Sequence, residues 1–244
     1  ILATPQTIKS QLTISVDPTA TIADSQNKII PGHTREDQLT GEKVIGVSGT
    51  KKVGDPAKGG ITIYNKSLTA KPFKKSSILT ASGLNFTLDS AVQVASATES
   101  VGSITFGKTT GAITAEAIGA ESNLSSGTEF TFKDTFSSVA IARNDALLAG
   151  GTSREVTVVT RSDYDTLVSE LTNELLAQAK EKLATSISGG EKLLDPTLKT
   201  TVTEKVFAQE LDQEAKELSG KITVTVSGIS YSESDLAVVF ENSI

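Results

Sequence analysis

Short stretches in which apolar and polar residues alternate recur along the first 160 residues of the chain. Leu12, Ile14 and Val16 alternate with polar neighbours, and Phe130 and Phe132 do so within Thr128–Phe136. Alternation at every second residue is typical of a strand with one buried face. The strands follow one another at intervals of about ten residues, with turn sequences between them, and this spacing favours a β sandwich or barrel.

Glycine and proline mark the expected ends of these strands. Pro31-Gly32 is expected to end the strand that holds Ile29 and Ile30, and Gly54–Gly60 is expected to form a turn before a strand at Ile61–Asn65. Ser77–Leu88 has a Ser-Gly turn between two apolar runs, which predicts a β-hairpin. Glu42–Gly54 is predicted to be a strand with a bulge at Gly46.

The period changes to that of a helix after residue 160. Apolar residues then recur every fourth position, at Leu167, Leu171, Leu175, Ala179 and Leu183. We predict a long helix over residues 162–187, capped by Ser162 and ended by Gly189-Gly190. Strands at Leu198–Leu211 and Gly220–Tyr231 follow, and Ser232 is predicted to cap a short last helix.

These elements predict a chain that is mainly β, with an α+β C-terminal unit in the order helix–strand–strand–helix. We expect an N-terminal β segment at residues 1–55, a β sandwich or barrel at 56–152, and the α+β unit at 153–244. In one alternative, Ile61–Asn65 pairs with the C-terminal strands, so that residues 66–150 form an insertion.

Composition narrows the possible functions. The 244 residues include 23 Lys and Arg against 29 Asp and Glu, a net charge of −6 that argues against a nucleic-acid-binding surface. The basic run Lys71–Lys75 is short and is expected to lie at a solvated strand end. Ser and Thr make up about a quarter of the chain, well above the usual share. The absence of Cys excludes disulfides, thiolate metal sites and cysteine nucleophiles.

The first residue is Ile1, and the chain contains no Met. We therefore expect a processed or partial chain, with a signal peptide or membrane anchor upstream of Ile1. The chain itself has no run of about 18 apolar residues that could span a membrane.

The segment Gly102–Thr109, with the sequence GSITFGKT, matches the phosphate-binding pattern of Gly, four residues and Gly-Lys-Thr. Such a loop must lead into a helix whose N-terminus faces the phosphates. Ile104 and Phe106 favour a strand instead, and the residues after Lys108 alternate as a strand would. We therefore predict a strand here, and no cofactor-binding residue.

We assign no catalytic or metal-binding residues. His33 is the only histidine, and we expect it to be exposed in a loop, since no nucleophile motif of the Gly-x-Ser-x-Gly type accompanies it. The acidic cluster Glu210–Glu217 is expected to be a solvated loop. Calcium binding by scattered carboxylates is conceivable, although no EF-hand spacing supports it. Glycosylation sequons occur at Asn65, Asn85 and Asn123, and several are expected by chance in such a chain.

Four stretches resemble the baseplate J-like family. Gly59–Val94 is similar to the opening of that family, where a strand ending in Asn leads to a second strand, a Gly turn and a Leu-x-Phe-x-Leu strand. Ile113–Phe132 resembles the next part, with turns at Gly119, Asn123 and Gly127. Leu147–Leu176 resembles the Gly-Gly step and long helix, and Ile222–Leu236 the last strand and helix. The resemblance covers residues 56–240 and implies no catalytic residues.

These features favour a non-enzymatic extracellular structural protein. We expect a surface-layer, cell-envelope or appendage subunit, of bacterial origin, whose partners are copies of itself or other envelope subunits, with no cofactor. The alternative is a baseplate component of a phage tail or of a contractile injection system. A third possibility is a surface enzyme or glycan-binding module, which few Tyr and no Trp make a weaker fit.

Overall fold

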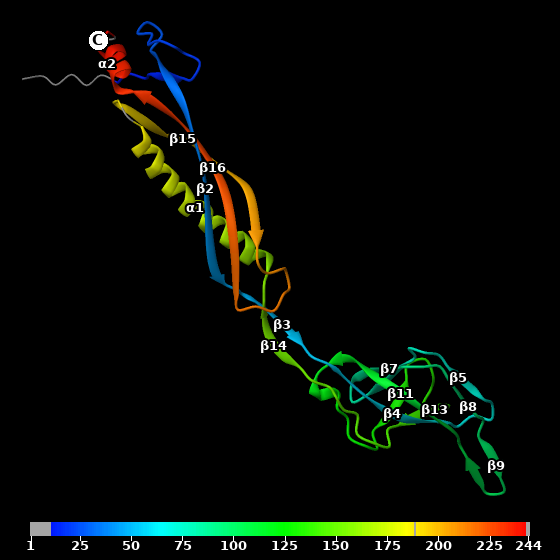
Figure 1. Cartoon of the computed structure of the whole chain (residues 1–244). Helices are drawn as coiled ribbons and strands as arrows, with labels where there is room; N and C mark the ends of the chain where they lie inside the picture. The colour runs from blue at the N-terminus through cyan, green and yellow to red at the C-terminus, as the bar shows by residue number, and fades with distance from the viewer. Residues whose placement is uncertain (1–10, 188, 243–244) are drawn as a thin grey trace, which may run out of the picture. The chain divides into compact units, whose positions relative to one another are not determined.

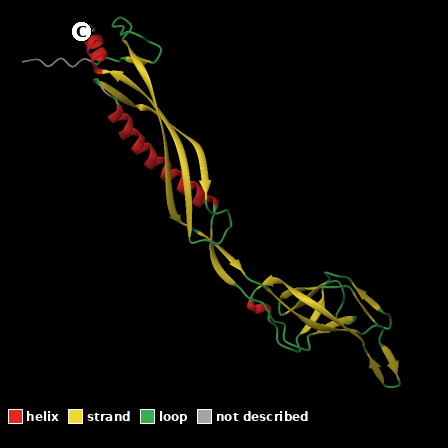
Figure 2. Cartoon of the chain, viewed as in Figure 1, coloured by secondary structure: helices red, strands yellow, loops and turns green. Residues whose placement is uncertain are grey.

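The computed structural model describes residues 11–187 and 189–242, which form two compact units. Unit 1 contains residues 11–49 and 157–242, and unit 2 is Thr50–Val156. The chain therefore leaves unit 1 once and returns to it, so that unit 2 is inserted in the sequence of unit 1 (Figure 1). Strands dominate both units, and the protein is mainly β as predicted (Figure 2).

Unit 1 is a four-stranded sheet with two helices. The strand order is β1-β2-β16-β15, in which β1 is parallel to β2 and the other pairs are antiparallel. The elements are β1 (Ser15–Asp17), β2 (Ile29–Gly46), α1 (Arg161–Ser186), β15 (Glu191–Phe207), β16 (Glu217–Ser232) and α2 (Glu233–Glu241). The predicted order of helix, two strands and helix is therefore confirmed for the C-terminal part.

The N-terminal strand β2 belongs to this same sheet, which differs from the expected separate segment at residues 1–55. Pro31-Gly32 does not end the strand. Pro31, which has no backbone N–H to donate, lies just outside the ladder between β2 and β16, whose first pair on β2 is Gly32 with Tyr231. A side chain at position 32 would meet Ile229 and Val16 at 2.8 Å, so the glycine is needed for close strand packing. The expected strand Glu42–Gly54 is divided, since β2 ends at Gly46 and β3 begins at Gly49.

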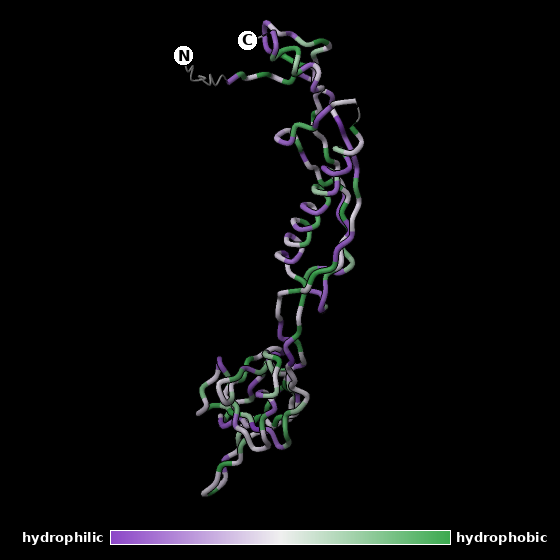
Figure 3. Tube along the Cα trace, turned by 90° about the vertical axis from the view of Figure 1, so that its left-hand side faces the viewer, coloured by the Kyte–Doolittle hydropathy of each residue, from purple (hydrophilic) through white to green (hydrophobic). Residues whose placement is uncertain are grey.

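Helix α1 covers one face of the sheet. Its buried residues recur every fourth position as predicted, and they pack against Leu218, Ile222, Val224 and Val226 of β16. Figure 3 shows hydrophobic and hydrophilic positions alternating along the helix. A Cβ at Gly41 would lie 3.0 Å from Leu171, and one at Gly220 would lie 2.7 Å from Leu167. Glycines in the two strands thus give the helix leucines room to approach the sheet.

The start of α1 differs from the prediction, because Thr160 and not Ser162 is the cap. The Thr160 hydroxyl accepts a hydrogen bond from the Asp163 backbone N–H, and the Asp163 carboxylate accepts one from the Thr160 N–H. The same carboxylate accepts hydrogen bonds from the backbone N–H and hydroxyl of Ser48. Asp163 therefore joins the start of the helix to the connection between β2 and Gly49, in addition to completing the cap at Thr160.

Unit 2 is a closed six-stranded barrel in the order β11-β4-β13-β12-β6-β7. Its strands are β4 (Pro56–Asn65), β6 (Ile78–Ala81), β7 (Leu84–Leu88), β11 (Gly107–Ile118), β12 (Glu129–Phe132) and β13 (Ala140–Arg143). Three strand pairs complete the chain: β3 (Gly49–Val53) with β14 (Arg154–Val158), β5 (Lys71–Phe73) with β8 (Val92–Val94), and β9 (Thr98–Ser100) with β10 (Ser103–Thr105). A 3₁₀ turn, η1, occupies Ala120–Ser122.

Strand β4 corrects two expectations. It continues through Gly59 and Gly60, where a turn was expected, because a Cβ at Gly59 would lie 2.4 Å from the Leu148 side chain that packs over the strand. Ile61–Asn65 pairs with β11 and β13 inside the barrel, so the alternative pairing with the C-terminal strands is wrong. β4 alternates inward and outward residues, which suits a barrel wall.

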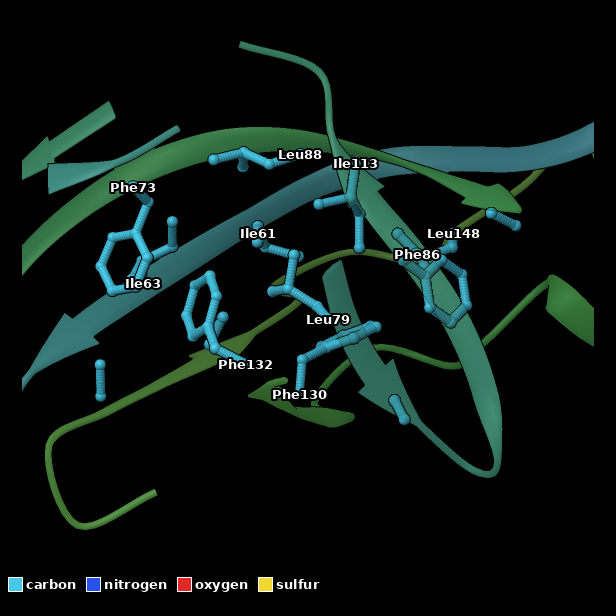
Figure 4. Packing of buried hydrophobic residues seen from close by; sticks show 14 of the residues in the cluster. Ile61, Ile63, Phe73, Leu79, Phe86, Leu88, Ile113, Phe130, Phe132 and Leu148 are labelled. Atoms are coloured by element: carbon cyan, nitrogen blue, oxygen red, sulfur yellow. The ribbon is translucent and has the colours of Figure 1, made fainter. Parts of the chain in front are cut away.

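The barrel core is filled by aliphatic and aromatic side chains (Figure 4). Phe86 and Phe130 meet edge to face with their ring centroids 5.3 Å apart, and Phe73 stacks on Phe132 at 4.1 Å. Ile63 and both members of the edge-to-face pair are fully buried. The interior is therefore occupied by side chains, as in other small barrels.

The predicted hairpin at Ser77–Leu88 is confirmed as β6 and β7. Its two turn residues, Ser82 and Gly83, both have positive φ angles, of 52° and 78°. Two consecutive residues of this kind form the tight turn whose twist matches paired strands.

Candidate functional site

The segment that matches a phosphate-binding loop lies on strands, as predicted. Gly102 occupies the turn between β9 and β10 with a φ of 82°, and Lys108 lies on β11 opposite Tyr64 of β4. The helix N-terminus that a phosphate would need does not follow, since residues 107–118 are strand. Lys108 and Tyr64 line a shallow polar hollow of about 490 Å³, in which the Thr62 hydroxyl donates to the Asp145 carboxylate at 2.6 Å.

His33 lies on strand β2 and not in the expected loop, and it is exposed. Its Nε2 is 3.8 Å from Oε1 of Glu191 on β15. The buried Ser230 of β16 is nearby, so the three residue types of a hydrolytic triad are gathered on one face of the sheet.

Their contacts are those of an ion-pair network. The Ser230 hydroxyl donates to Glu191 Oε2 at 2.7 Å and accepts from Arg35 Nε at 3.1 Å, so it is not hydrogen-bonded to the His33 ring. A serine nucleophile needs that bond to the histidine. The hydrogen bond from Arg35, with that from Ser230, lowers the pKa of Glu191 despite its partial burial. The cluster therefore ties β2, β16 and β15 together.

The carboxylates form no converging group. In residues 11–187 and 189–242, no three or more His, Asp or Glu side chains are placed to hold a metal ion together. The acidic stretch Glu210–Glu217 spans the connection between β15 and β16 and the first residue of β16. Hydrogen bonds from Tyr164 Oη to the Gln209 carbonyl and from Ala215 N to the Thr157 carbonyl hold this loop in place.

Two of the three sequon asparagines serve the fold. Asn65 is fully buried, and its amide donates to the carbonyls of Thr69 and Ala95 while its oxygen accepts from Ser67. Asn123 exchanges two hydrogen bonds with the backbone of Gly151. Asn85 is exposed on β7. The side chain of Asn65 is thus buried and fully hydrogen-bonded within the barrel unit.

Asn144 is a fourth important asparagine that the sequence did not single out. It is fully buried, its oxygen accepts from the Thr128 N–H at 2.7 Å, and its amide donates to the carbonyls of Ser125 and Ala146. Its position directly after a strand, before an Asp, is the only sequence signal, and such a signal is typical of many ordinary turns.

A group of exposed apolar side chains of unit 2 lies at one end of the barrel. Five large apolar side chains are exposed there: Leu68 (61%), Val101 (109%), Ile104 (58%), Phe106 (42%) and Phe136 (83%). We name this group the barrel tip. Val101 and Ile104 belong to the β9–β10 hairpin, which projects beyond the barrel strands in Figure 1.

The strand register brings the barrel tip together. Asn65, at the end of β4, lies opposite Gly107 on one side and Ala140 on the other. Leu68, Phe106 and Phe136 each lie within a few residues of these positions. Lys66 contacts two of these segments. Its Nζ lies 6.0 Å from the Phe106 ring centroid and donates a hydrogen bond to the carbonyl of Ser137, the residue after Phe136, at 3.0 Å.

A hollow and a set of lysines accompany the apolar side chains. Residues 131–137, including Phe136, line an open hollow of about 530 Å³. The three connections at this end of the barrel are residues 66–77, 89–106 and 133–139. They carry Lys66, Lys71, Lys74, Lys75 and Lys133 against Asp89, Glu99 and Asp134. The barrel tip is therefore apolar with a mainly basic surround.

No protein-family model matches the chain, and no curated protein is significantly similar to it. No helix within the described residues is both long and apolar enough to cross a bilayer.

Proposed function

We propose that this chain is a non-enzymatic structural subunit that self-assembles through the barrel tip. The observation that carries the proposal is the exposure of five large apolar side chains on one end of a closed, well-packed barrel. Apolar groups that gather on one surface and are rimmed by polar residues are typical of protein interaction sites. These side chains stand on the connections that join the ends of the barrel strands.

The polar groups of the molecule support a structural role. The side-chain amides of three asparagines, Asn65, Asn123 and Asn144, donate hydrogen bonds to backbone carbonyls of the barrel unit. The carboxylate of Asp163 takes part in the cap of α1. Ser230, His33 and Glu191 form a network in which the serine is held by a carboxylate. These side chains are occupied in holding the fold.

The proposed setting is outside the cell, as a subunit of a surface layer, envelope structure or appendage. A cysteine-free, Ser/Thr-rich β protein suits folding without redox assistance. The resemblance of residues 56–240 to the baseplate J-like family favours a related second candidate, a phage-tail or contractile-injection baseplate component. Neighbouring genes separate the two: tail sheath and tube genes would favour the second candidate.

The proposal is tested by the oligomeric state of the purified chain. Sedimentation velocity over a range of concentrations is expected to show reversible association of the wild type. Replacing Val101 and Phe136 with Ser should abolish it, because these are the two most exposed apolar side chains of the tip. Val206→Ser, at a 51% exposed position on β15, is the matched control and should associate normally. Wild-type protein that stays monomeric at all concentrations would overturn the proposal.

A further inference from the structure

A second surface of mixed apolar and charged character lies on unit 1, around α2. Val239 is fully buried, whereas its neighbours Val238 and Phe240 are 48% and 49% exposed. The loop between β1 and β2 adds Ile22, which is 76% exposed. Figures 1 and 3 both place this loop and α2 at the same end of unit 1. We name this surface the α2 end.

The α2 end is acidic where the barrel tip is basic. Its carboxylates are Asp17, Asp24, Glu191, Glu233, Asp235 and Glu241, and its cations are Lys28, Arg35 and Lys192. Lys192 forms an ion pair with Glu233, and the carboxylates of Asp17 and Asp24 accept hydrogen bonds from their own loop. Those hydrogen bonds, from Thr19 to Asp17 and from Asn27 to Asp24, lower the pKa of both groups, so both are charged at neutral pH.

The same contrast holds for the two units as wholes. Unit 2 has 11 Lys and Arg against 9 Asp and Glu, a net charge of +2, while the rest of the chain has 12 against 20, a net charge of −8. Surfaces of opposite charge steer encounters between molecules and fix their register.

We propose that the barrel tip of one copy binds the α2 end of a second copy. This inference rests on the proposed function and names its partner. Both surfaces offer exposed aromatic and aliphatic side chains, and their charges are complementary. A contact between two barrel tips would instead bring Lys66, Lys133 and their equivalents together, at a cost in like-charge repulsion.

The proposed contact joins two different surfaces. Two copies leave no surface free only if both tip-to-end contacts form at once; with a single contact, one barrel tip and one α2 end stay free, and further copies can add. Contacts of this type build rings when the rotation between copies closes and filaments when it does not.

The deciding experiment mixes two variants that are each defective on one side. The tip variant carries Val101→Ser and Phe136→Ser, and the end variant carries Val238→Ser and Phe240→Ser. Each alone should be monomeric, with self-association weakened about 30-fold or more, as expected for lost central apolar anchors. An equimolar mixture should form a 1:1 heterodimer and nothing larger, because the end variant still has an intact tip and the tip variant an intact α2 end.

A milder variant guards against misfolding of α2. Glu241→Lys changes only an exposed charge at the last residue of the helix, so it should weaken association without changing the circular dichroism spectrum. Association of the wild type should also weaken as salt rises, because salt screens exposed charges.

Several results would overturn the inference. If the end variant alone assembles as well as the wild type, or if the mixture stays monomeric, the tip does not bind the α2 end. In either case an assembling wild type would leave the proposed function standing. If the tip variant loses binding to anionic phosphatidylserine vesicles while its self-association is unchanged, the tip binds lipid and the inference fails.

Discussion

The two units bury the apolar face of their strands in different ways. Unit 2 closes its six strands into a barrel around four buried phenylalanines, Phe73, Phe86, Phe130 and Phe132. Unit 1 leaves its sheet open and covers one face with the leucines of α1. Closure removes the sheet edges, whereas an open sheet keeps two edges that must be protected.

The edges of unit 1 carry such protection. In the described residues, β15 pairs only with β16, and β2 is paired on its other side only through residues 29–31. β15 contains Pro196 and two register shifts, and β2 carries Lys43 and Asp37 on the helix side, where they pair with residues of α1. Charges that point inward and irregular pairing both discourage the addition of another strand. These protected edges fit the proposed assembly through surface patches better than assembly through added strands.

The buried polar groups differ as well. Among the described residues of unit 2 they are Thr62, Asn65, Ser122 and Asn144, which do not titrate in the acid range, whereas unit 1 buries the carboxylate of Asp163. The barrel should therefore depend less on pH than the helix-covered sheet.

The largest expected effect separates the two cores. Phe130→Ala removes a fully buried ring from the barrel and should lower the free energy of unfolding of unit 2 by about 3–5 kcal/mol. Hydrogen exchange by mass spectrometry, read for each unit, should show faster exchange in residues 50–156 and unchanged protection in α1. Phe136→Ala is the control, with a change within about 0.5 kcal/mol. Equal loss of protection in both units would show that they unfold together.

A smaller effect is expected at Asn144. Asn144→Ala leaves the Thr128 N–H and the carbonyls of Ser125 and Ala146 without the amide that bonds them, at a cost of about 2–4 kcal/mol in unit 2. Chemical denaturation measures the loss, and Asn85→Ala, at an exposed position, should cost little. A small loss at position 144 would mean that water replaces the amide.

Acid should distinguish the two units. Burial alone would raise the pKa of Asp163, but hydrogen bonds from Ser48 and Thr160 outweigh it and lower the pKa, and the bond from Arg35 lowers that of Glu191. A lowered carboxyl pKa stabilises the fold above the unfolded value, near about 4, and this stability is lost as the pH falls through the folded value.

We therefore expect unit 1 to lose hydrogen-exchange protection before unit 2 as the pH is lowered from 5 to about 2. Asp163→Asn should reduce this acid sensitivity and destabilise α1 at neutral pH by about 1–2 kcal/mol, since the amide replaces only part of the cap. Loss of unit 2 first would contradict the assignment of pH dependence to the carboxylates of unit 1.

The smallest expected effect tests a turn. Gly83→Ala places a side chain at a φ of 78° in the β6–β7 turn and should cost about 1–2 kcal/mol. Gly46→Ala is the matched control, because no atom lies within 4 Å of its added Cβ and its φ is not in the left-handed region. Thermal unfolding of both variants checks the difference, and equal melting temperatures would show that the turn adopts another conformation at low cost.

The sequence by itself determined features that depend on neighbours along the chain. The fourfold recurrence of Leu167 to Leu183 specified α1, the Ser-Gly turn specified the β6–β7 hairpin, and Ser232 specified the start of α2. The strand at Lys108 followed from Ile104 and Phe106. Each is local because a turn, a cap or an amphipathic period involves residues only a few positions apart.

Only the tertiary structure decided what depends on distant residues. Phe130, Phe132 and Phe136 look alike in sequence, but the turn after Phe132 leaves Phe136 exposed at the barrel tip. Gly59 and Pro31-Gly32 read as breaks, yet both lie inside strands because Leu148 and Ile229 pack against them. The packing of remote segments, which no local pattern encodes, placed β2 beside β16 and gathered five apolar side chains on one end of the barrel.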